Sequence, residues 1–204
     1  ISPSTFRRQV RGGKGIIGGA TKEEDEIKII RYSNNHDNLL YFTNKGRVFQ
    51  LPVYEIPSAS RTAKGQPIVN LLQLQEGENV TAILNAKEEF SGEYLFMATK
   101  RGTVKKTQVS EFGKVRKSGL IAIKLRDGDS LEWVKETSKE NQVIIVTKQG
   151  KGIRFQESDA RSMGRPSMGV RGIKLKPEDE VVEMDVIQNP EEAEVLVITE
   201  NGLG

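Results

Sequence analysis

The stretch that decides the fold is Leu39-Leu40-Tyr41-Phe42-Thr43-Asn44-Lys45-Gly46-Arg47-Val48-Phe49. An apolar run leads into Thr, two polar residues and Gly, and a second run with apolar residues follows. Short runs rich in aromatic and β-branched residues are typical of strands, and a polar loop that ends in Gly is typical of a hairpin turn with left-handed glycine. The stretch therefore predicts two antiparallel strands joined by a tight turn.

The same pattern returns three times along the chain. The later copies cover residues 94–104, 143–153 and 195–202, and the glycines at 46, 102, 150 and 202 are spaced 56, 48 and 52 residues apart. Such self-similarity is typical of a repeat architecture. After each hairpin a third strand is expected, beginning at residues 65–68, 119–121 and 169–173. An acidic turn then leads into a fourth strand, at residues 74–80, 125–131 and 175–181.

Four strands per repeat predict an all-β fold, a β-pinwheel in which four-stranded blades form a propeller-like toroid. The chain would be a partial ring within one domain, residues 1–204. Its expected parts are a partial first blade at 1–31, whole blades at 32–86, 87–138 and 139–189, and the start of another at 190–204. We find no convincing helical period over ten or more residues.

Composition excludes several classes of function. The 204 residues include no cysteine and one histidine, and the mean hydropathy is -0.48. Disulfides, thiol catalysis, cysteine-ligated zinc and histidine metal clusters are therefore excluded. No run approaches the roughly 18 apolar residues of a membrane span. We expect a soluble cytoplasmic protein with no membrane partner, with His36 in a polar surface turn.

Positive charge gathers at one place in each repeat, although the net charge is only +3. The loops between the two halves of the repeats hold cations and no carboxylate, whereas acids gather in the turns before the fourth strands and in the connectors. The cations singled out are Arg61 and Lys64 in residues 57–68, Lys114, Arg116 and Lys117 in residues 112–124, and Arg161, Arg165 and Arg171 in residues 161–176.

Repetition of one loop around a ring would place these cations on one continuous rim. A basic rim is typical of a protein that holds duplex DNA through its phosphates. The aromatic residues fall in the predicted strands, where they would pack in the core, and this argues against single-strand binding by base stacking. The alternative stays open, because any soluble repeat protein carries basic loops somewhere.

The N-terminal region contains the most glycine-rich of these loops, Gln9-Val10-Arg11-Gly12-Gly13-Lys14-Gly15, which follows Arg7 and Arg8. Glycines let backbone N–H groups approach a phosphate closely. Gly15-Ile16-Ile17 resembles the start of a third strand, and residues 23–27 resemble the acidic turn into a fourth. The heptapeptide is thus predicted to be the basic loop of the first blade. The alternative is a flexible, solvated N-terminal tail.

Motifs for catalysis are missing. Lys14 is followed by Gly instead of Ser or Thr, which argues against a nucleotide-binding P-loop. The acidic turns at residues 127–129 and 178–180 do not continue into calcium loops and are interpreted as solvated hairpin turns. The four tyrosines lack a nearby His or clustered acids. We expect no catalytic residue, no metal and no cofactor in this chain.

These motifs together resemble the C-terminal domain of bacterial DNA gyrase A. The heptapeptide is similar to that family's box, Q-[R/K]-R-G-G-[R/K]-G, and departs from it at Val10. Further similarity lies in Tyr54-Glu55-Ile56-Pro57, Ala59-Ser60-Arg61-Thr62-Ala63-Lys64-Gly65, Pro67-Ile68-Val69-Asn70-Leu71-Leu72 and Gly169-Val170-Arg171-Gly172-Ile173.

The resemblance implies a six-bladed β-pinwheel that wraps duplex DNA around its rim and gives the enzyme directional strand passage and negative supercoiling. Its partners would be the rest of gyrase A together with gyrase B, in a heterotetramer in the bacterial cytoplasm, at the nucleoid. ATP and Mg²⁺ would be used elsewhere in the holoenzyme. DNA-binding residues are implied to include Arg7, Arg8, Gln9, Arg11, Gly12, Gly13, Lys14 and Gly15. Two alternatives are the corresponding domain of topoisomerase IV and a protein-binding propeller.

Overall fold

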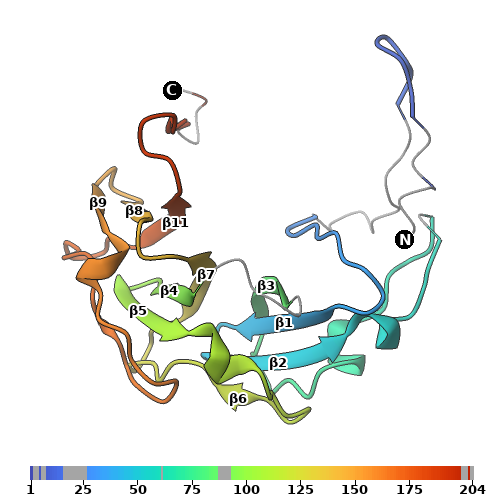
Figure 1. Ribbon diagram of the computed structural model, residues 1–204, viewed down its shortest axis with the longest axis horizontal. Coiled ribbons are helices and arrows are strands. Elements are labelled where there is room, and N and C mark those ends of the chain that lie inside the picture. The colour runs from blue at the N-terminus through green and yellow to red at the C-terminus, as the bar shows by residue number, and fades with distance from the viewer. Residues whose placement is uncertain are drawn as a thin grey trace.

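A computed structural model describes residues 1, 5, 8–15, 27–60, 62–86, 93–198 and 202. These residues form three sheets arranged along a crescent (Figure 1), and every pair of named strands is antiparallel. The only helical elements among them are short 3-10 turns, so the all-β prediction is confirmed. The strands are β1 (Asn38–Thr43), β2 (Arg47–Pro52), β3 (Val80–Ala86), β4 (Tyr94–Thr99), β5 (Thr103–Gln108), β6 (Leu120–Ile121), β7 (Leu131–Thr137), β8 (Gln142–Thr147), β9 (Gly152–Gln156), β10 (Val170–Arg171) and β11 (Val181–Ile187).

The predicted hairpins are β1–β2, β4–β5 and β8–β9. In the first turn the Gly46 N–H donates to the Thr43 carbonyl at 2.9 Å, and the same bond closes the other two turns. Gly46, Gly102 and Gly150 have φ angles of 73°, 78° and 75°. Glycine adopts this left-handed conformation without the steric cost that a Cβ brings, which confirms the predicted turn chemistry.

The fourth strand of each unit pairs with the first strand of the same unit. β3 pairs with β1, β7 with β4, and β11 with β8. Each ladder has a register shift near its end, between Phe42 and Thr43 in the first sheet and between Ala98 and Thr99 in the second. These three strands occupy the predicted positions.

The third strand joins the sheet of the preceding unit. β6 comes from the second repeat but pairs with β2, and β10 comes from the third repeat but pairs with β5. The incoming strand also docks on the hairpin glycine, because the N–H groups of Ala122 and Ile123 donate to the Gly46 carbonyl. The sequence repeat and the structural sheet are therefore offset by one strand. The third sheet consists of β11, β8 and β9 in the part of the chain that the structure describes.

Two predicted strands are not formed. Residues 65–68 do not begin a strand, and the 3-10 turn η3 (Ile68–Asn70) follows them. A third strand needs the second strand of a preceding unit as its partner, and no such strand precedes β1 among the described residues. Residues 195–198 lie exposed outside any strand. A first strand pairs with the second and fourth strands that follow it, and no described residue after Ile198 forms either of them. The strand and acidic turn expected at residues 15–27 lie almost wholly outside the described residues.

The core lies between neighbouring sheets. One apolar cluster includes Leu40, Phe42, Leu95 and Met97, and so joins the first sheet to the second, while another includes Phe96 and Ile145 and joins the second to the third. Tyr41 and Phe49 are buried in a separate cluster of the first unit. The strand aromatics thus pack as predicted. His36 is exposed in a turn, also as predicted. No helix among the described residues has the length and apolar character to cross a membrane.

Candidate nucleic-acid interface

The sheets have an inner and an outer edge. β7 packs against both β3 and β11, so the fourth strands lie together on the inside of the crescent. Strand order runs from β3 through β1 and β2 to β6 in the first sheet, and from β7 to β10 in the second. β6 and β10 are therefore the outermost strands, and Figure 1 shows β6 on the periphery. The basic loops that contain them lie on the outer rim.

The basic loop of residues 112–124 is anchored to the preceding unit. Arg47 of β2 donates from Nη2 to the Ser118 carbonyl at 2.6 Å, and its Nη1 pairs with the buried Glu78 carboxylate at 2.7 Å. The Val115 N–H donates to Gln50 Oε1 at 3.3 Å. The loop's three predicted DNA-binding cations, Lys114, Arg116 and Lys117, are all exposed. Lys117 pairs with Glu55 at 3.2 Å, a largely exposed pair that a phosphate can replace at little cost.

The basic loop of residues 161–176 presents two exposed predicted cations, Arg161 and Arg171. Arg165 is only partly exposed, and its backbone N–H donates to Glu111 Oε2 at 3.1 Å. The Met163 N–H is bonded to the Lys106 carbonyl at 2.8 Å. Arg165 therefore combines a place on the rim with a structural contact to the second unit.

These two loops meet. The Lys124 N–H donates to the Ser167 carbonyl at 3.0 Å, which brings the exposed cations of two adjacent units onto neighbouring segments of the rim. In the 57–68 loop, which forms no strand, Lys64 is exposed, whereas Arg61 lies outside the described residues.

The heptapeptide closes on itself through Gln9. Its side chain accepts the Gly15 N–H at 2.9 Å and donates to the Gly15 carbonyl at 3.2 Å. A Cβ on Gly13 would lie 2.6 Å from Gln9 Oε1, so this compact loop needs glycine there. Gly12 and Gly15 have positive φ. The cyclic bond pattern makes Gln9 the residue that closes the loop.

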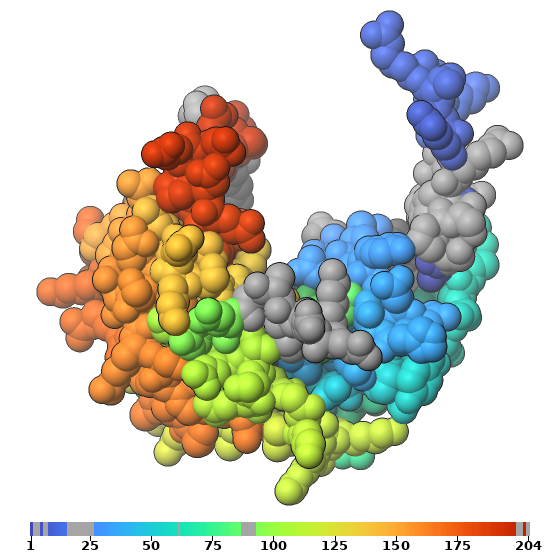
Figure 2. Space-filling view, viewed as in Figure 1, coloured from blue at the N-terminus to red at the C-terminus, as the bar shows by residue number. Residues whose placement is uncertain are grey.

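The described cations in the heptapeptide and just before it point to solvent. Arg8, Arg11 and Lys14 are exposed, and so is Val10, at 85% of its possible surface. Arg7 lies outside the described residues. Figure 2 shows the N-terminal residues, in blue, standing away from the body of the sheets. Val10 therefore occupies an outward position from which a cation could have reached a phosphate.

The prediction that the acidic turns at residues 127–129 and 178–180 are solvated is wrong for Asp129, and Glu78 in the corresponding turn at residues 74–80 is hydrogen-bonded in the same way. Thr43 Oγ1 donates to Glu78 at 2.7 Å, and Thr99 Oγ1 donates to Asp129 at 2.7 Å. Glu78 also accepts the Gln75 N–H, and Asp129 accepts the Arg101 N–H. These acids bind the fourth-strand turn to the hairpin of the same unit. They are engaged in the sheet and leave the rim cations of the 112–124 and 161–176 loops largely unneutralised.

Sequence reasoning missed the residues that hold the basic loops in place. Arg47, Gln50 and Glu111 each contact a loop of the next unit, and Glu78 holds the Arg47 guanidinium in place. The repeat alignment did not single them out, because the loop atoms that they contact belong to the next unit and are distant in sequence. Only the exchange of the third strand brings them next to the loops.

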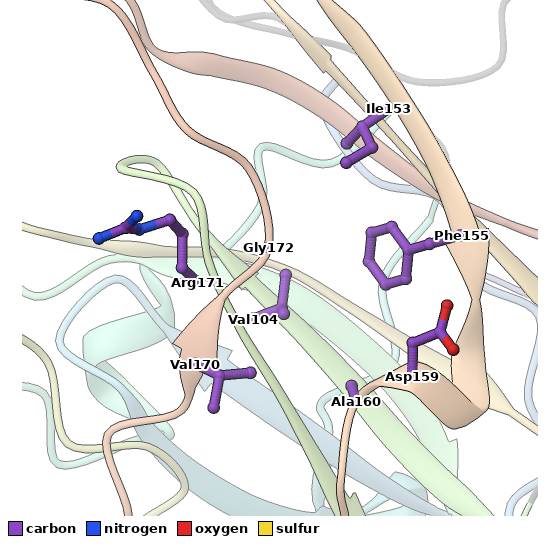
Figure 3. A pocket seen from close by; sticks show the side chains of 8 residues that line it. All are labelled: Val104, Ile153, Phe155, Asp159, Ala160, Val170, Arg171 and Gly172. Atoms are coloured by element: carbon purple, nitrogen blue, oxygen red, sulfur yellow. The ribbon is translucent and has the colours of Figure 1, made fainter.

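No group of three or more His, Cys, Asp or Glu side chains among the described residues could hold a metal ion. A cavity of about 220 Å³ lies beside β9, lined mainly by apolar groups with Asp159 at one side. Figure 3 shows Phe155 and Ile153 facing it while the Arg171 side chain points away.

Comparison with known proteins identifies the family. The chain matches the family model described as "DNA gyrase C-terminal domain, beta-propeller" over residues 1–31, 37–87, 93–138 and 141–188. It is 45% identical to DNA gyrase A of Salmonella typhimurium over 199 residues, which are 98% of this chain and 22% of that protein. For DNA gyrase A of Escherichia coli the identity is 46% over 201 residues, 98% of this chain and 23% of that protein. The chain thus spans less than a quarter of the length of these relatives.

Two solved structures of related C-terminal domains align with this chain. The C-terminal domain of DNA topoisomerase IV aligns with a TM-score of 0.74 at 30% identity, covering 84% of this chain and 54% of that one. The DNA gyrase A C-terminal domain aligns with a TM-score of 0.70 at 30% identity, covering 92% and 60%. The family model covers most of the chain in four consecutive segments that include all three observed sheets. This chain therefore belongs to the DNA gyrase A C-terminal domain family.

Proposed function

We propose that this chain binds duplex DNA against its outer rim and bends it along the crescent. The observation that carries the proposal is the placement of the basic loops on the outermost strands of two adjacent sheets. Lys114, Arg116, Arg161 and Arg171 are exposed there. Cations on a convex edge contact successive phosphates only if the duplex follows the curve, and each contact releases counterions.

Glycine-rich loops and the heptapeptide extend this surface. Exposed Arg11 and Lys14 flank glycines that allow a phosphate to approach the backbone. We place Arg7, Arg8, Gly12, Gly13, Gly15, Arg61, Lys64, Lys117 and Arg165 in the same interface. Gln9 supports it by closing the loop.

In the holoenzyme, the wrapped duplex would present a second segment to the cleavage gate, giving directional strand passage and negative supercoiling. We propose that the chain works as the non-catalytic wrapping domain of DNA gyrase A, in a heterotetramer with gyrase B in the cytoplasm, at the nucleoid. ATP and Mg²⁺ would act in other parts of that enzyme, and this chain would need no cofactor.

The direct test is a topology assay with the complete protein that carries this sequence. Nicked circular plasmid is incubated with the protein at low salt, the nicks are sealed, and the linking number is measured. Wrapping is expected to shift the linking number, and the shift is expected to fall steeply as salt rises. An unchanged linking number at low salt would refute the proposal.

The heptapeptide has its own test in the assembled enzyme. Changing Arg11 and Lys14 together to Ala is expected to abolish supercoiling while relaxation persists, because two exposed phosphate contacts on the wrapping path are lost. The salt dependence of duplex binding is expected to flatten by a slope of about 1.8. Lys28→Ala with Lys139→Ala removes the same two charges from exposed positions outside the basic loops and is expected to leave supercoiling intact.

Topoisomerase IV is the second candidate, because its C-terminal domain shares the fold with a TM-score of 0.74. The near-complete heptapeptide favours gyrase. An enzyme that relaxes plasmid but does not supercoil it with the heptapeptide intact would favour topoisomerase IV. A protein-binding propeller would show neither activity and no salt-dependent binding of duplex.

A further inference from the structure

Lys105 occupies a position that holds an apolar residue in the other two hairpins. It lies in the middle of β5, opposite Met97 of β4. Phe49 of β2 and Ile153 of β9 occupy the same place, each three residues after the hairpin glycine. Lys105 has no exposed surface. Packing alone would be satisfied by an apolar side chain here, so the amino group calls for a separate explanation.

The amino group of Lys105 joins two basic loops. Nζ donates to the Ala122 carbonyl at 2.7 Å and also to the Arg165 carbonyl. Ala122 belongs to the 112–124 loop, whose β6 pairs with the first sheet, and Arg165 belongs to the 161–176 loop, whose β10 pairs with the second. One buried cation thus contacts the loops of two successive units directly behind the rim.

We propose that Lys105 is a positioning residue that fixes the spacing between the 112–124 and 161–176 loops and so sets the register of their cations along the duplex. The proposal rests on the proposed function of the rim. Lys105 does not touch DNA itself. It acts through the two carbonyls that it binds.

The surroundings of the amino group support this role. Burial lowers the pKa of Lys105 to about 8, with the Glu111 carboxylate acting in the opposite direction and the Arg165 guanidinium in the same direction as burial. Glu111 also accepts the Arg165 N–H, so the Arg165 backbone is held from both its N–H and its carbonyl. Bonds from a charged donor are about twice as strong as neutral ones. Burial disfavours the charged form of Lys105, and the two backbone carbonyls that accept from its amino group offset this cost.

The first test needs no DNA. In Lys105→Met the stem is kept and the donor is lost, and hydrogen exchange is followed peptide by peptide in the complete protein. Amides of residues 112–124 and 161–176 are expected to exchange about ten-fold faster than in the wild type, with β4 and β8 unchanged. Ile153→Met is the matched control. It changes the equivalent position of the third hairpin, whose side chain donates no hydrogen bond to either loop. Unchanged exchange in both loops would overturn the proposal.

The second test separates spacing from simple affinity. A DNA hairpin with a stem of about 6 base pairs, roughly 20 Å long, contacts fewer rim cations than a duplex of about 40 base pairs, which can follow both loops. Lys105→Met is expected to weaken binding of the long duplex about ten-fold and leave binding of the DNA hairpin unchanged. Equal weakening of both would indicate a general structural defect and overturn the proposal. If the wild type binds neither duplex, the proposed function of the rim fails, and the exchange experiment still tests the clamp.

Two further variants keep the result interpretable. Lys105→Phe carries the residue of the first sheet and repeats the test if Lys105→Met does not fold. Lys105→Arg retains a cation with donors for both carbonyls and is expected to keep most of the long-duplex affinity. If Lys105→Arg behaves like Lys105→Met, the donor is not what positions the loops, and the proposal is wrong.

Discussion

The outer edges of the first two sheets differ from that of the third. β2 and β5 are each covered by a strand from the next unit, whereas no described strand covers β9. A Cβ on Gly46 would lie 2.4 Å from the Ile123 carbonyl oxygen, and one on Gly102 would lie 2.7 Å from Ile173, but a Cβ on Gly150 would meet nothing within 4 Å. The repeated glycine thus serves two needs. It forms the turn in every unit, and it admits the incoming strand where one is present.

The side chains on these edges show the same contrast. Val48 and Val104 are buried, and their sister residue Gly152 is exposed. Ile153 retains 37% of its surface where Phe49 and Lys105 have none. The second strand of each hairpin is therefore buried by the third strand of the following unit, and the hairpin alone does not bury it. A repeat of this kind completes its core only when its neighbour arrives.

The largest expected effect is on the glycines. In this 204-residue chain, Gly46→Ala or Gly102→Ala is expected to lower the free energy of unfolding by roughly 3 kcal/mol, because left-handed strain adds to a clash with the docked strand. Gly150→Ala carries the strain alone and should cost about 1 kcal/mol. Urea denaturation measures all three. Equal losses would show that strand docking does not restrict the glycine.

A smaller effect concerns the pH dependence of stability. Lys105 of β5 contributes to it because its amino group titrates, whereas Ile153 at the equivalent position of β9 does not titrate. The pKa of Lys105 is lowered to about 8 by burial, below its ordinary value of 10.5. Between these values the unfolded chain binds more protons than the folded one, so this group makes stability rise with pH. The wild type should gain roughly 1 kcal/mol relative to Lys105→Met between pH 8 and pH 9. Parallel stability curves for the two proteins would contradict a buried, titrating lysine.

The sequence was sufficient to predict the hairpins and the fourth strands, but it was insufficient to predict which sheet each third strand joins. Hairpins and fourth strands follow from local signals, namely apolar runs and the turn glycine, and they form as predicted. The third strand of the first unit, expected at residues 65–68, does not form, because no described strand is available to pair with it. The periodicity of the sequence does not show which sheet supplies a partner. The exchange of β6 and β10 between units is a long-range pairing that no local pattern specifies.

For the rim, sequence identified the cations but not their supports. Charge sorting within the repeat found Lys114, Arg116 and Arg171, whose exposure follows from their place in polar loops. Arg47 and Lys105 looked like ordinary strand residues, since their roles depend on carbonyls of Ser118, Ala122 and Arg165 that are distant in sequence. Hydrogen bonds to backbone atoms leave no residue-type signature at the acceptor.

The smallest expected effect would make the open edge resemble the closed ones. Gly152 does not have a left-handed φ, and the nearest atom to a Cβ built on it is the Ile145 carbonyl oxygen at 4.0 Å, so there is room for a Cβ at this exposed position. Valine favours a strand and lowers the entropy of the unfolded chain, so we expect a gain of about 0.5 to 1 kcal/mol from Gly152→Val in this chain. Gly152→Ala should give a smaller gain. The gain is limited because no described strand buries the new side chain as β6 and β10 bury Val48 and Val104. A loss of stability in urea denaturation would mean that β9 needs glycine for a reason other than its uncovered edge.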